Sequence, residues 1–499
     1  MTGGALLLRQ SLWSALGWIL PALAALWAVP GLTRSLGATG FGLLAIAWSL
    51  VGWFSAADLG LSRAVTQGVA RALARGARHE AAALTWSALA LMTPVCVLAA
   101  ALLWWSAPWL VGFIHLGPDD QQDGLRAIHW IALAIPSTVL MTALRGVLEG
   151  ARSFKAVTLL RVPLGVAFAL VPLALAVNGY GVVGAIQGIV LVRTIGLVFH
   201  LVAVLAVLPE MRRVQLAAPE AQQALLSFGG WTTVSNIISP LMNAMDRLGI
   251  GALIPVAAVT PYAIAFEGGT KIWLLTATLV PVLYPAFAAL LTHDAASATG
   301  RLEQGNRAIL AVGLPVLIGF AALAEPGMRL WVGQALAPEA ALSLQLLAIG
   351  LAANLSGQVA LAFVQAAERP SLAAWGHLVE LPLFVVGLWW AVPRYGAAGA
   401  AAVWSLRATG DALWLLIAAA HAEPTVRPRR RSLLAWTTLA TVLIGAVAVL
   451  ARIAPPALAL LIGLSAWGAL ISRGGLLTRA EWSGMRRELQ RFSEGAGRR

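Results

Sequence analysis

The sequence predicts an all-α polytopic membrane protein with about 14 transmembrane helices, arranged as two pseudo-symmetric six-helix lobes plus two C-terminal helices. Hydrophobic residues make up 60% of the 499 residues and charged residues only 11%, and the mean hydropathy is +0.82, far outside the composition of a soluble domain. The apolar runs have the ~20-residue length of a membrane-spanning helix. Alternating ten-residue patterns typical of barrels are absent, so helices must satisfy the backbone polar groups.

The apolar runs define the spans in chain order. The first six are expected near residues 11–33, 40–60, 82–114, 126–148, 157–177 and 181–208. The next six are expected near residues 230–254, 260–291, 307–325, 341–366, 372–393 and 396–420, and two more near 433–453 and 455–472. The first run is full length and has no short apolar region followed by a cleavage site, so we expect an uncleaved first span.

The arginines test this count through the positive-inside rule. They gather in every second connection: Arg71, Arg75 and Arg78; Arg152 with Lys155; Arg212 and Arg213; Arg301 and Arg307; Arg369; and Arg427, Arg429, Arg430 and Arg431. We therefore expect an even number of spans with both termini cytoplasmic. Membrane topology also accounts for the net charge of +13 better than a nucleic-acid partner does, and no nucleic acid is expected.

An internal repeat predicts the lobes. Asn178-Gly-Tyr-Gly-Val-Val-Gly-Ala185 precedes Arg193 in the first half, and Arg394-Tyr-Gly-Ala-Ala-Gly-Ala400 precedes Arg407 in the second. Each motif opens the sixth span of its half. The predicted domains are a first lobe (1–208), a cytoplasmic linker (209–223), a second lobe (224–421), a basic loop (422–432), two extra spans (433–473) and a basic amphipathic tail (474–499). The tail fits either a helix on anionic lipid or a solvated segment.

Four charges inside the seventh and eighth spans mark the candidate site: Asp246, Arg247, Glu267 and Lys271. An ionisable side chain in the bilayer core costs at least ~2.5 kcal/mol, so it usually faces a partner or a water-filled cavity. Glu267 and Lys271 are one helical turn apart and can pair. A second interpretation stays open, in which these charges are self-neutralising pairs that only join the helices.

A polar stripe adds to these charges. Asn236, Ser239, Asn243 and Arg247 recur at helical spacing and lie on one face of the seventh span, which favours a cavity lining. A second stripe, Ser55, Asp58, Ser62 and Thr66 with Arg63 beside it, is expected near the end of the second span. Arg145 with Glu149, and Arg407 with Asp411, have the separation of helical ion pairs.

Features of enzymes and metalloproteins are missing from the sequence. The seven histidines have no metal-ligand spacing, and the single Cys96 excludes an intrachain disulfide. There is no phosphate-binding glycine loop and no large extramembrane domain. We therefore expect no catalytic residues, no metal, no cofactor and no enzyme activity.

Several short motifs together resemble the polysaccharide-exporter and O-antigen flippase branch of the multidrug/oligosaccharidyl-lipid/polysaccharide exporter superfamily. They are listed as they stand: Ser35-Leu-Gly-Ala-Thr-Gly-Phe-Gly42, Ala57-Asp-Leu-Gly-Leu61 followed by Arg63, Gly230-Trp231 through Met245-Asp-Arg247, Tyr262, Lys271, and Leu283-Tyr-Pro285. The resemblance covers about residues 8–420.

This resemblance implies a flippase of the bacterial inner membrane that moves an undecaprenyl-pyrophosphate-linked oligosaccharide by alternating access of two lobes, for O-antigen, lipopolysaccharide or exopolysaccharide synthesis. It also implies the bilayer, a polysaccharide polymerase and glycosyltransferases as partners. Arg247 and Lys271 are the first candidates for the pyrophosphate, and Arg34, Arg63 and Arg193 the second. Asn236, Ser239 and Asn243 are candidates for sugar hydroxyls. Asp58, Asp246 and Glu267 either couple transport to a cation or orient the arginines.

Three alternatives remain at this point. A lipid II flippase, or an exporter of teichoic acid, would share the mechanism with another cargo. A cation-coupled multidrug antiporter of the same superfamily is less favoured, because residues 11–33 contain no acidic residue where such antiporters commonly keep one. A non-transporting scaffold for envelope polysaccharide enzymes would not need charged stripes inside its spans.

Overall fold

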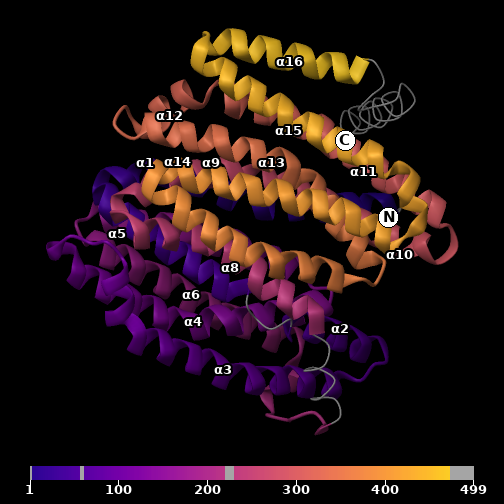
Figure 1. The fold of residues 1–499 in the computed structure, drawn as a ribbon. Coiled ribbons are helices and arrows are strands. Elements are labelled where there is room, and N and C mark those ends of the chain that lie inside the picture. Colours follow the sequence, from indigo (N-terminus) through magenta and orange to yellow (C-terminus); the bar gives the residue numbers. More distant parts are fainter. Residues whose placement is uncertain (1–2, 57–60, 220–229, 473–499) are drawn as a thin grey trace, which may run out of the picture. The chain divides into compact units, whose positions relative to one another are not determined.

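The computed structural model describes residues 3–56, 61–219 and 230–472. Every regular element in these ranges is helical, which confirms the all-α prediction (Figure 1). The elements up to residue 219 are α1 (Gly3–Ala56), α2 (Leu61–Ala74), α3 (Arg78–Phe113), η1 (Pro118–Asp120), α4 (Gln121–Gly150), α5 (Phe154–Val177), α6 (Gly181–Val207) and η2 (Pro209–Arg212). The following elements are α8 (Gly230–Leu253), η3 (Val256–Ala258), α9 (Val259–Gly269), η4 (Thr270–Ile272), α10 (Trp273–His293), α11 (Ala295–Ala322), α12 (Ala324–Val332), α13 (Ala337–Ala366), α14 (Pro370–Ala422), η5 (Pro424–Arg429), α15 (Arg430–Ile453) and α16 (Pro456–Ser472).

Each expected span overlaps one or more described helices. Ten helical stretches in the described residues are long and apolar enough to cross a membrane. Two of them contain a non-helical glycine, Gly37 in α1 and Gly396 in α14, and each therefore holds two of the expected spans. The two remaining spans correspond to α8 and to the shorter α16. The chain is a polytopic membrane protein.

The structure also corrects the expected boundaries. The span expected at 260–291 is divided into α9 and α10 by the short 3-10 turn η4. Ser62 and Thr66 belong to a separate short helix, α2, and not to the second span. Asp58, with which they were expected to form a stripe, lies outside the described residues, as do residues 220–223 of the predicted linker and the predicted tail 474–499.

The internal repeat has a counterpart in the backbone. Gly181 and Gly396, which occupy the same place in the two repeat motifs, both have positive φ, at 62° and 59°. Only glycine adopts such angles without steric cost. The last glycine of each motif is also crowded, because a Cβ on Gly184 would lie 2.3 Å from the Cβ of Tyr180 and one on Gly399 would lie 3.1 Å from the Cβ of Tyr395.

The chain divides into two compact units. The first comprises Met1–Gly268 and His377–Val403, and the second Gly269–Gly376 and Trp404–Arg499. The lobes expected at 1–208 and 224–421 stay a prediction. Between apolar helices in a bilayer, close van der Waals packing and interhelical hydrogen bonds replace the hydrophobic effect.

In the first unit, α4 is the central helix, with α2, α3 and α6 packed around it (Figure 1). Their buried residues form one cluster that includes Val65, Met92, Leu144 and Val147. Two glycines on α4 allow α2 to approach closely. A Cβ on Gly146 would lie 2.7 Å from the carbonyl oxygen of Ser62, and one on Gly150 would lie 2.6 Å from that of Thr66.

In the second unit, α13 is the central helix, and most of its residues are buried. The two C-terminal helices α15 and α16 pack against α11, and α15 also packs against α13. Trp467 of α16 donates through Nε1 to the carbonyl of Ala311 at 2.9 Å, and Arg452 of α15 donates through Nε to Oε1 of Gln345 at 3.0 Å. The extra spans are therefore hydrogen-bonded parts of this unit.

Candidate functional site

Two charged clusters lie within the helices of the first unit, and the first is built by α8 and α9. These helices form a hairpin whose connection contains η3. Asp246 precedes residue 254 by eight positions and Tyr262 follows it by eight. Asp246 lies seven residues before the end of α8, and Tyr262 lies three residues after the start of α9. The hairpin brings their side chains into contact.

Asp246 is completely buried, and its carboxylate is held from two sides. The hydroxyl of Tyr262, also buried, donates to Oδ2 of Asp246. The backbone N–H of Arg247 donates to Oδ1 at 2.6 Å, and the guanidinium Nη1 of Arg247 lies 3.8 Å from the same oxygen. A buried carboxylate is tolerated only with such partners. Tyr262 and Arg247 therefore fix the orientation of Asp246.

Arg247 has a fixed side chain, but one of its guanidinium N–H donors has no acceptor among the described residues. Its Nη1 donates to the carbonyl of Asn243 at 3.1 Å, and its guanidinium lies over the ring of Phe266, 4.5 Å from the centroid. Its Nε is buried and has no hydrogen-bond partner among the described residues. A buried donor without an acceptor is costly and is often explained by a ligand. The described residues therefore leave one buried donor of Arg247 without an acceptor.

The remaining predicted residues lie at several places in the described structure. Asn243 is half-buried on α8, one turn before Arg247, while the side chains of Asn236 and Ser239 lie outside the described part. Glu267 is half-buried near the end of α9, and Lys271 lies on η4. The sequence predicts that these two residues share one uninterrupted helix. The 3-10 turn η4 instead separates Lys271 from α9, which carries Glu267.

The secondary arginine candidates differ in exposure. Arg34 on α1 and Arg63 on α2 are exposed, whereas Arg193 is half-buried on α6. The guanidinium of Arg193 lies 4.4 Å from the ring centroid of Phe168. Asp58 is not among the described residues.

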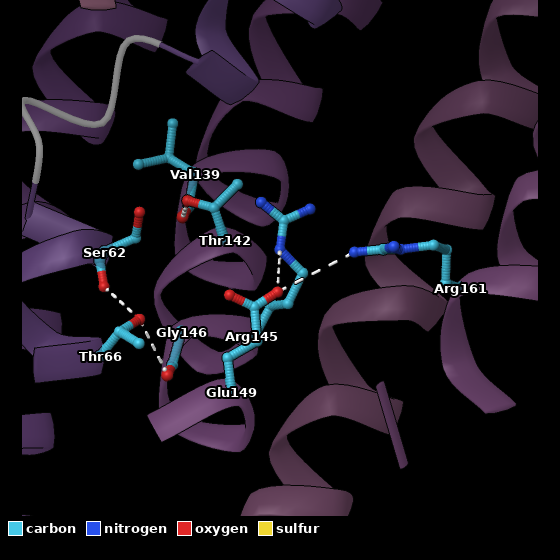
Figure 2. Close-up of polar contacts among 8 residues, drawn as sticks. All are labelled: Ser62, Thr66, Val139, Thr142, Arg145, Gly146, Glu149 and Arg161. Carbon is cyan, nitrogen blue, oxygen red and sulfur yellow. Dashed lines mark hydrogen bonds and ion pairs between the residues drawn. The ribbon is translucent and has the colours of Figure 1, made fainter. Parts of the chain in front are cut away.

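The second cluster lies between α4 and α5 and includes an ion pair expected from the sequence. Glu149 lies 3.7 Å from Nε of Arg145, one turn earlier on α4, and 3.9 Å from Nη2 of Arg161 on α5. Figure 2 shows Nε of Arg145 and Nη2 of Arg161 facing this one carboxylate, while the terminal nitrogens of Arg145 point away from it. The same view shows the hydroxyl of Thr66 facing the backbone and not the ion pairs. It is 2.8 Å from the carbonyl oxygen of Ser62 and 3.0 Å from that of Gly146.

Sequence reasoning missed the roles of Tyr262 and Arg161. Each lies on the helix that follows its partner, so no i, i+4 spacing reveals it. The distance of each residue from the helical connection could have indicated these partners. Arg145 and Arg161 are eight residues before and after Ser153, and Asp246 and Tyr262 are eight residues before and after residue 254. Residues equidistant from a tight helical connection meet at one depth.

Comparisons with solved structures give the fold to which the chain is similar. The lipid II flippase MurJ in its inward closed conformation superposes with a TM-score of 0.68 at 10% sequence identity, covering 93% of this chain and 99% of that one. An inward-facing multidrug resistance MATE family transporter of the MOP superfamily gives a TM-score of 0.67 at 14% identity, covering 84% and 98%. The chain therefore has the fold of these transporters.

The sequence comparisons give the family. The family model described as polysaccharide biosynthesis protein matches residues 7–291, and the chain belongs to this family. A putative O-antigen transporter of Shigella flexneri is 26% identical over 410 residues, which is 82% of this chain and 96% of the relative. The resemblance stated from the sequence motifs is confirmed. The matched region contains both charged clusters of the first unit.

Proposed function

We propose that the protein is a flippase that moves an undecaprenyl-pyrophosphate-linked oligosaccharide across the bacterial inner membrane for surface polysaccharide synthesis. The observation that carries this proposal is the buried Arg247, with an unused Nε donor, inside the region that matches the polysaccharide biosynthesis family. A planar guanidinium suits pyrophosphate because it presents several donors to neighbouring oxygens. The protein then acts as a transporter and not as an enzyme.

The site residues divide the work in this proposal. Arg247, with Lys271 and in second place Arg34, Arg63 and Arg193, binds the anionic headgroup, and Asn236, Ser239 and Asn243 bind sugar hydroxyls. Asp246 orients Arg247, a role supported by its contacts with the Arg247 backbone and guanidinium. Asp58 and Glu267 are candidates for the same role or for coupling to a cation.

The drive and the cycle follow from the charge of the cargo. A negative-inside membrane potential favours expulsion of an anion by about 2.3 kcal/mol per charge for each 100 mV. Two lobes alternately opening to either side would carry the headgroup past the apolar core. The termini are cytoplasmic. Glycosyltransferases supply the cargo on one face of the membrane, and a polymerase consumes it on the other.

The test is loss and restoration of surface polysaccharide. Cells that lack the chain should lose surface polymer and accumulate the lipid-linked oligosaccharide in a form that externally added glycosidase cannot reach. The wild-type gene should restore both, whereas Arg247→Ala and Lys271→Ala should not, although both variants reach the membrane. Arg126→Ala, which removes a charge from the exposed end of α4, is the control and should restore both.

Two outcomes would overturn the proposal. Wild-type polymer in cells carrying the Arg247→Ala, Lys271→Ala double variant would remove the assigned site. Unchanged polymer in cells without the chain, together with new sensitivity to cationic drugs, would favour a multidrug antiporter instead.

A further inference from the structure

The ion pairs of the second cluster leave guanidinium donors available. Glu149 lies 3.7 and 3.9 Å from Arg145 and Arg161, well beyond the ~2.7–2.9 Å of a charge-assisted hydrogen bond. Arg161 is also held from its other side, because its guanidinium lies 4.7 Å from the ring centroid of Trp18. Glu149 therefore balances charge between the two arginines without saturating their donors.

Arg193 adds a third cation to this cluster. It lies on α6, which packs against both α4 and α5. Its guanidinium packs on Phe168, and its Nε is buried without a hydrogen-bond partner among the described residues. The group thus contains three guanidinium groups and one carboxylate. A surplus of two positive charges inside membrane-spanning helices is costly unless an anion joins it.

The three arginines are ordered by depth. Arg145 lies five residues before Gly150 and Arg161 seven residues after Phe154, so they are about 8 and 11 Å from the ends of their helices. Arg193 lies fourteen residues before Val207, about 21 Å from the same end of the unit. Arg152 and Lys155 lie in or next to the connection at that end. Positive charge therefore continues from the connection towards the middle of the spans.

We propose that Arg145, Arg161 and Arg193 form a pyrophosphate-binding track within the first unit, with Glu149 as a displaceable counter-ion. In the empty protein Glu149 holds Arg145 and Arg161. A pyrophosphate group, with about two negative charges, takes its place between them, and Arg193 receives the group deeper in the unit. This inference rests on the proposed function in one respect: the pyrophosphate is taken to be that of the lipid carrier.

A purely structural role for the cluster makes the opposite prediction for Glu149. If the pairs only join α4 to α5, Glu149→Gln leaves two arginines without a counter-ion and weakens everything that depends on the fold. If Glu149 competes with an anion, the same substitution frees both arginines and strengthens anion binding. The sign of the change separates the two roles.

The test is a binding titration on the purified full-length protein in nanodiscs of neutral lipid, with geranylgeranyl pyrophosphate and inorganic pyrophosphate as probes. We expect Arg161→Gln and Arg193→Gln each to weaken binding about tenfold, and Glu149→Gln to strengthen it by a similar factor. Arg126→Gln is the matched control, because Arg126 is also on α4 and lies 3.9 Å from a carboxylate, that of Asp123. Its affinity should stay within about twofold of the wild type.

The probes also identify the source of the ligand. Binding of both probes supports a track that recognises the pyrophosphate itself, and binding of the prenyl probe alone supports a track that reads the lipid carrier. No binding of either probe, wild-type affinity in both arginine variants, or weaker binding in Glu149→Gln would overturn the track. If Arg193→Gln fails to fold, Arg193→Lys keeps the charge and should bind more weakly than wild type but more tightly than Arg161→Gln.

The result is independent of the transport test. If the titration gives the expected binding pattern while removal of the protein leaves surface polysaccharide unchanged, that combination would contradict the proposed function and leave the track in place. Loss of surface polysaccharide together with wild-type binding in the arginine variants would contradict the track alone.

Discussion

Asp246 shows how a membrane-spanning helix keeps a carboxylate in its interior. The Tyr262 hydroxyl and the Arg247 N–H occupy its two oxygens, so neither oxygen is left without a donor. Removing one partner of a buried charged group leaves the other inadequately solvated, which costs more than the hydrogen bond itself contributes. The hydroxyl of Tyr262 is consequently worth more to stability than that of an exposed tyrosine.

Tyr262→Phe tests this at a single atom. We expect the variant to lose about 1–3 kcal/mol of stability, because it removes one donor from a buried carboxylate and keeps the ring that packs on Phe266. Thermal unfolding of the purified protein measures the change. Tyr284→Phe on α10, where 42% of the tyrosine is exposed, is the control and should change stability by less than about 0.5 kcal/mol. Equal effects of the two substitutions would contradict the role of the hydroxyl.

Glu210 gives the protein a pH-dependent contact outside its spans. Nε of Arg78 donates to the Glu210 carboxylate at 2.6 Å, and this hydrogen bond lowers the pKa of Glu210. A carboxyl group with a lowered folded-state pKa stabilises the protein above its ordinary pKa of about 4.3. That stabilisation is lost as the pH falls through the lower folded-state value.

Glu210→Gln should flatten the stability profile at acid pH. Thermal unfolding between about pH 6 and pH 3.5 should show a smaller loss of stability than in the wild type. Arg78→Gln should have the same effect, and the double variant should add nothing to either, because the two residues act as a pair. Additive effects in the double variant would show that the pH dependence has another origin.

At the scale of elements, α2 and α4 approach each other because Gly146 and Gly150 present no side chain. Small residues four apart are a common device for close helix packing in membranes. Here the hydroxyl of Thr66 bridges the two helices by donating to the carbonyl of Gly146. The contact positions α2, which carries Arg63, against the central helix of the first unit.

Gly146→Ala should therefore disrupt this contact. A Cβ there would lie 2.7 Å from the Ser62 carbonyl and 2.9 Å from the Thr66 hydroxyl, so we expect a loss of about 1–3 kcal/mol in thermal unfolding. Gly112→Ala on α3 is the control, because a Cβ there has no neighbour within 4 Å. It should stabilise the protein by up to about 1 kcal/mol, since alanine favours a helix over glycine.

Long apolar helices were predictable, and short or interrupted ones were not. The breaks at Gly37 and Gly396 fall between expected spans because glycine and polar residues separate the apolar runs there. The helices α2 and α12 escaped prediction because they are too short and too charged to form an apolar run. The turn η4 follows Gly268 and Gly269, a turn signal that the long apolar run around it outweighed.

The same division holds for the site. The Asp246–Arg247 and Arg145–Glu149 pairs follow from local spacing, and the structure contains both. Tyr262 and Arg161 join these pairs from the next helix along the chain, so their contribution depends on the length of the connection and on the rotation of one helix about its axis. Periodicity within a single helix carries no information on that rotation.

At the scale of the whole molecule, the arginine distribution predicts which connections face the cytoplasm. Single cysteines placed in a Cys96→Ala background test it. We expect a membrane-impermeant maleimide to label Asp119→Cys in intact spheroplasts, because the connection before α4 that contains η1 has two aspartates and no arginine. Arg152→Cys and Arg427→Cys should be labelled only after permeabilisation. The reverse pattern would invert the topology.

The hydrogen bonds that tie α15 and α16 to α11 and α13 bear on how far the chain can be shortened. Glu303 of α11 accepts from Arg429 at 2.9 Å and from Ser432 at 3.0 Å, near one end of the helix, and Ala311 accepts from Trp467 further along. A chain ending before Arg430 would expose this face of α11 to lipid acyl chains, which offer no hydrogen-bond donors. We therefore expect removal of the two C-terminal helices to destabilise the second unit, even though the internal repeat stops before them.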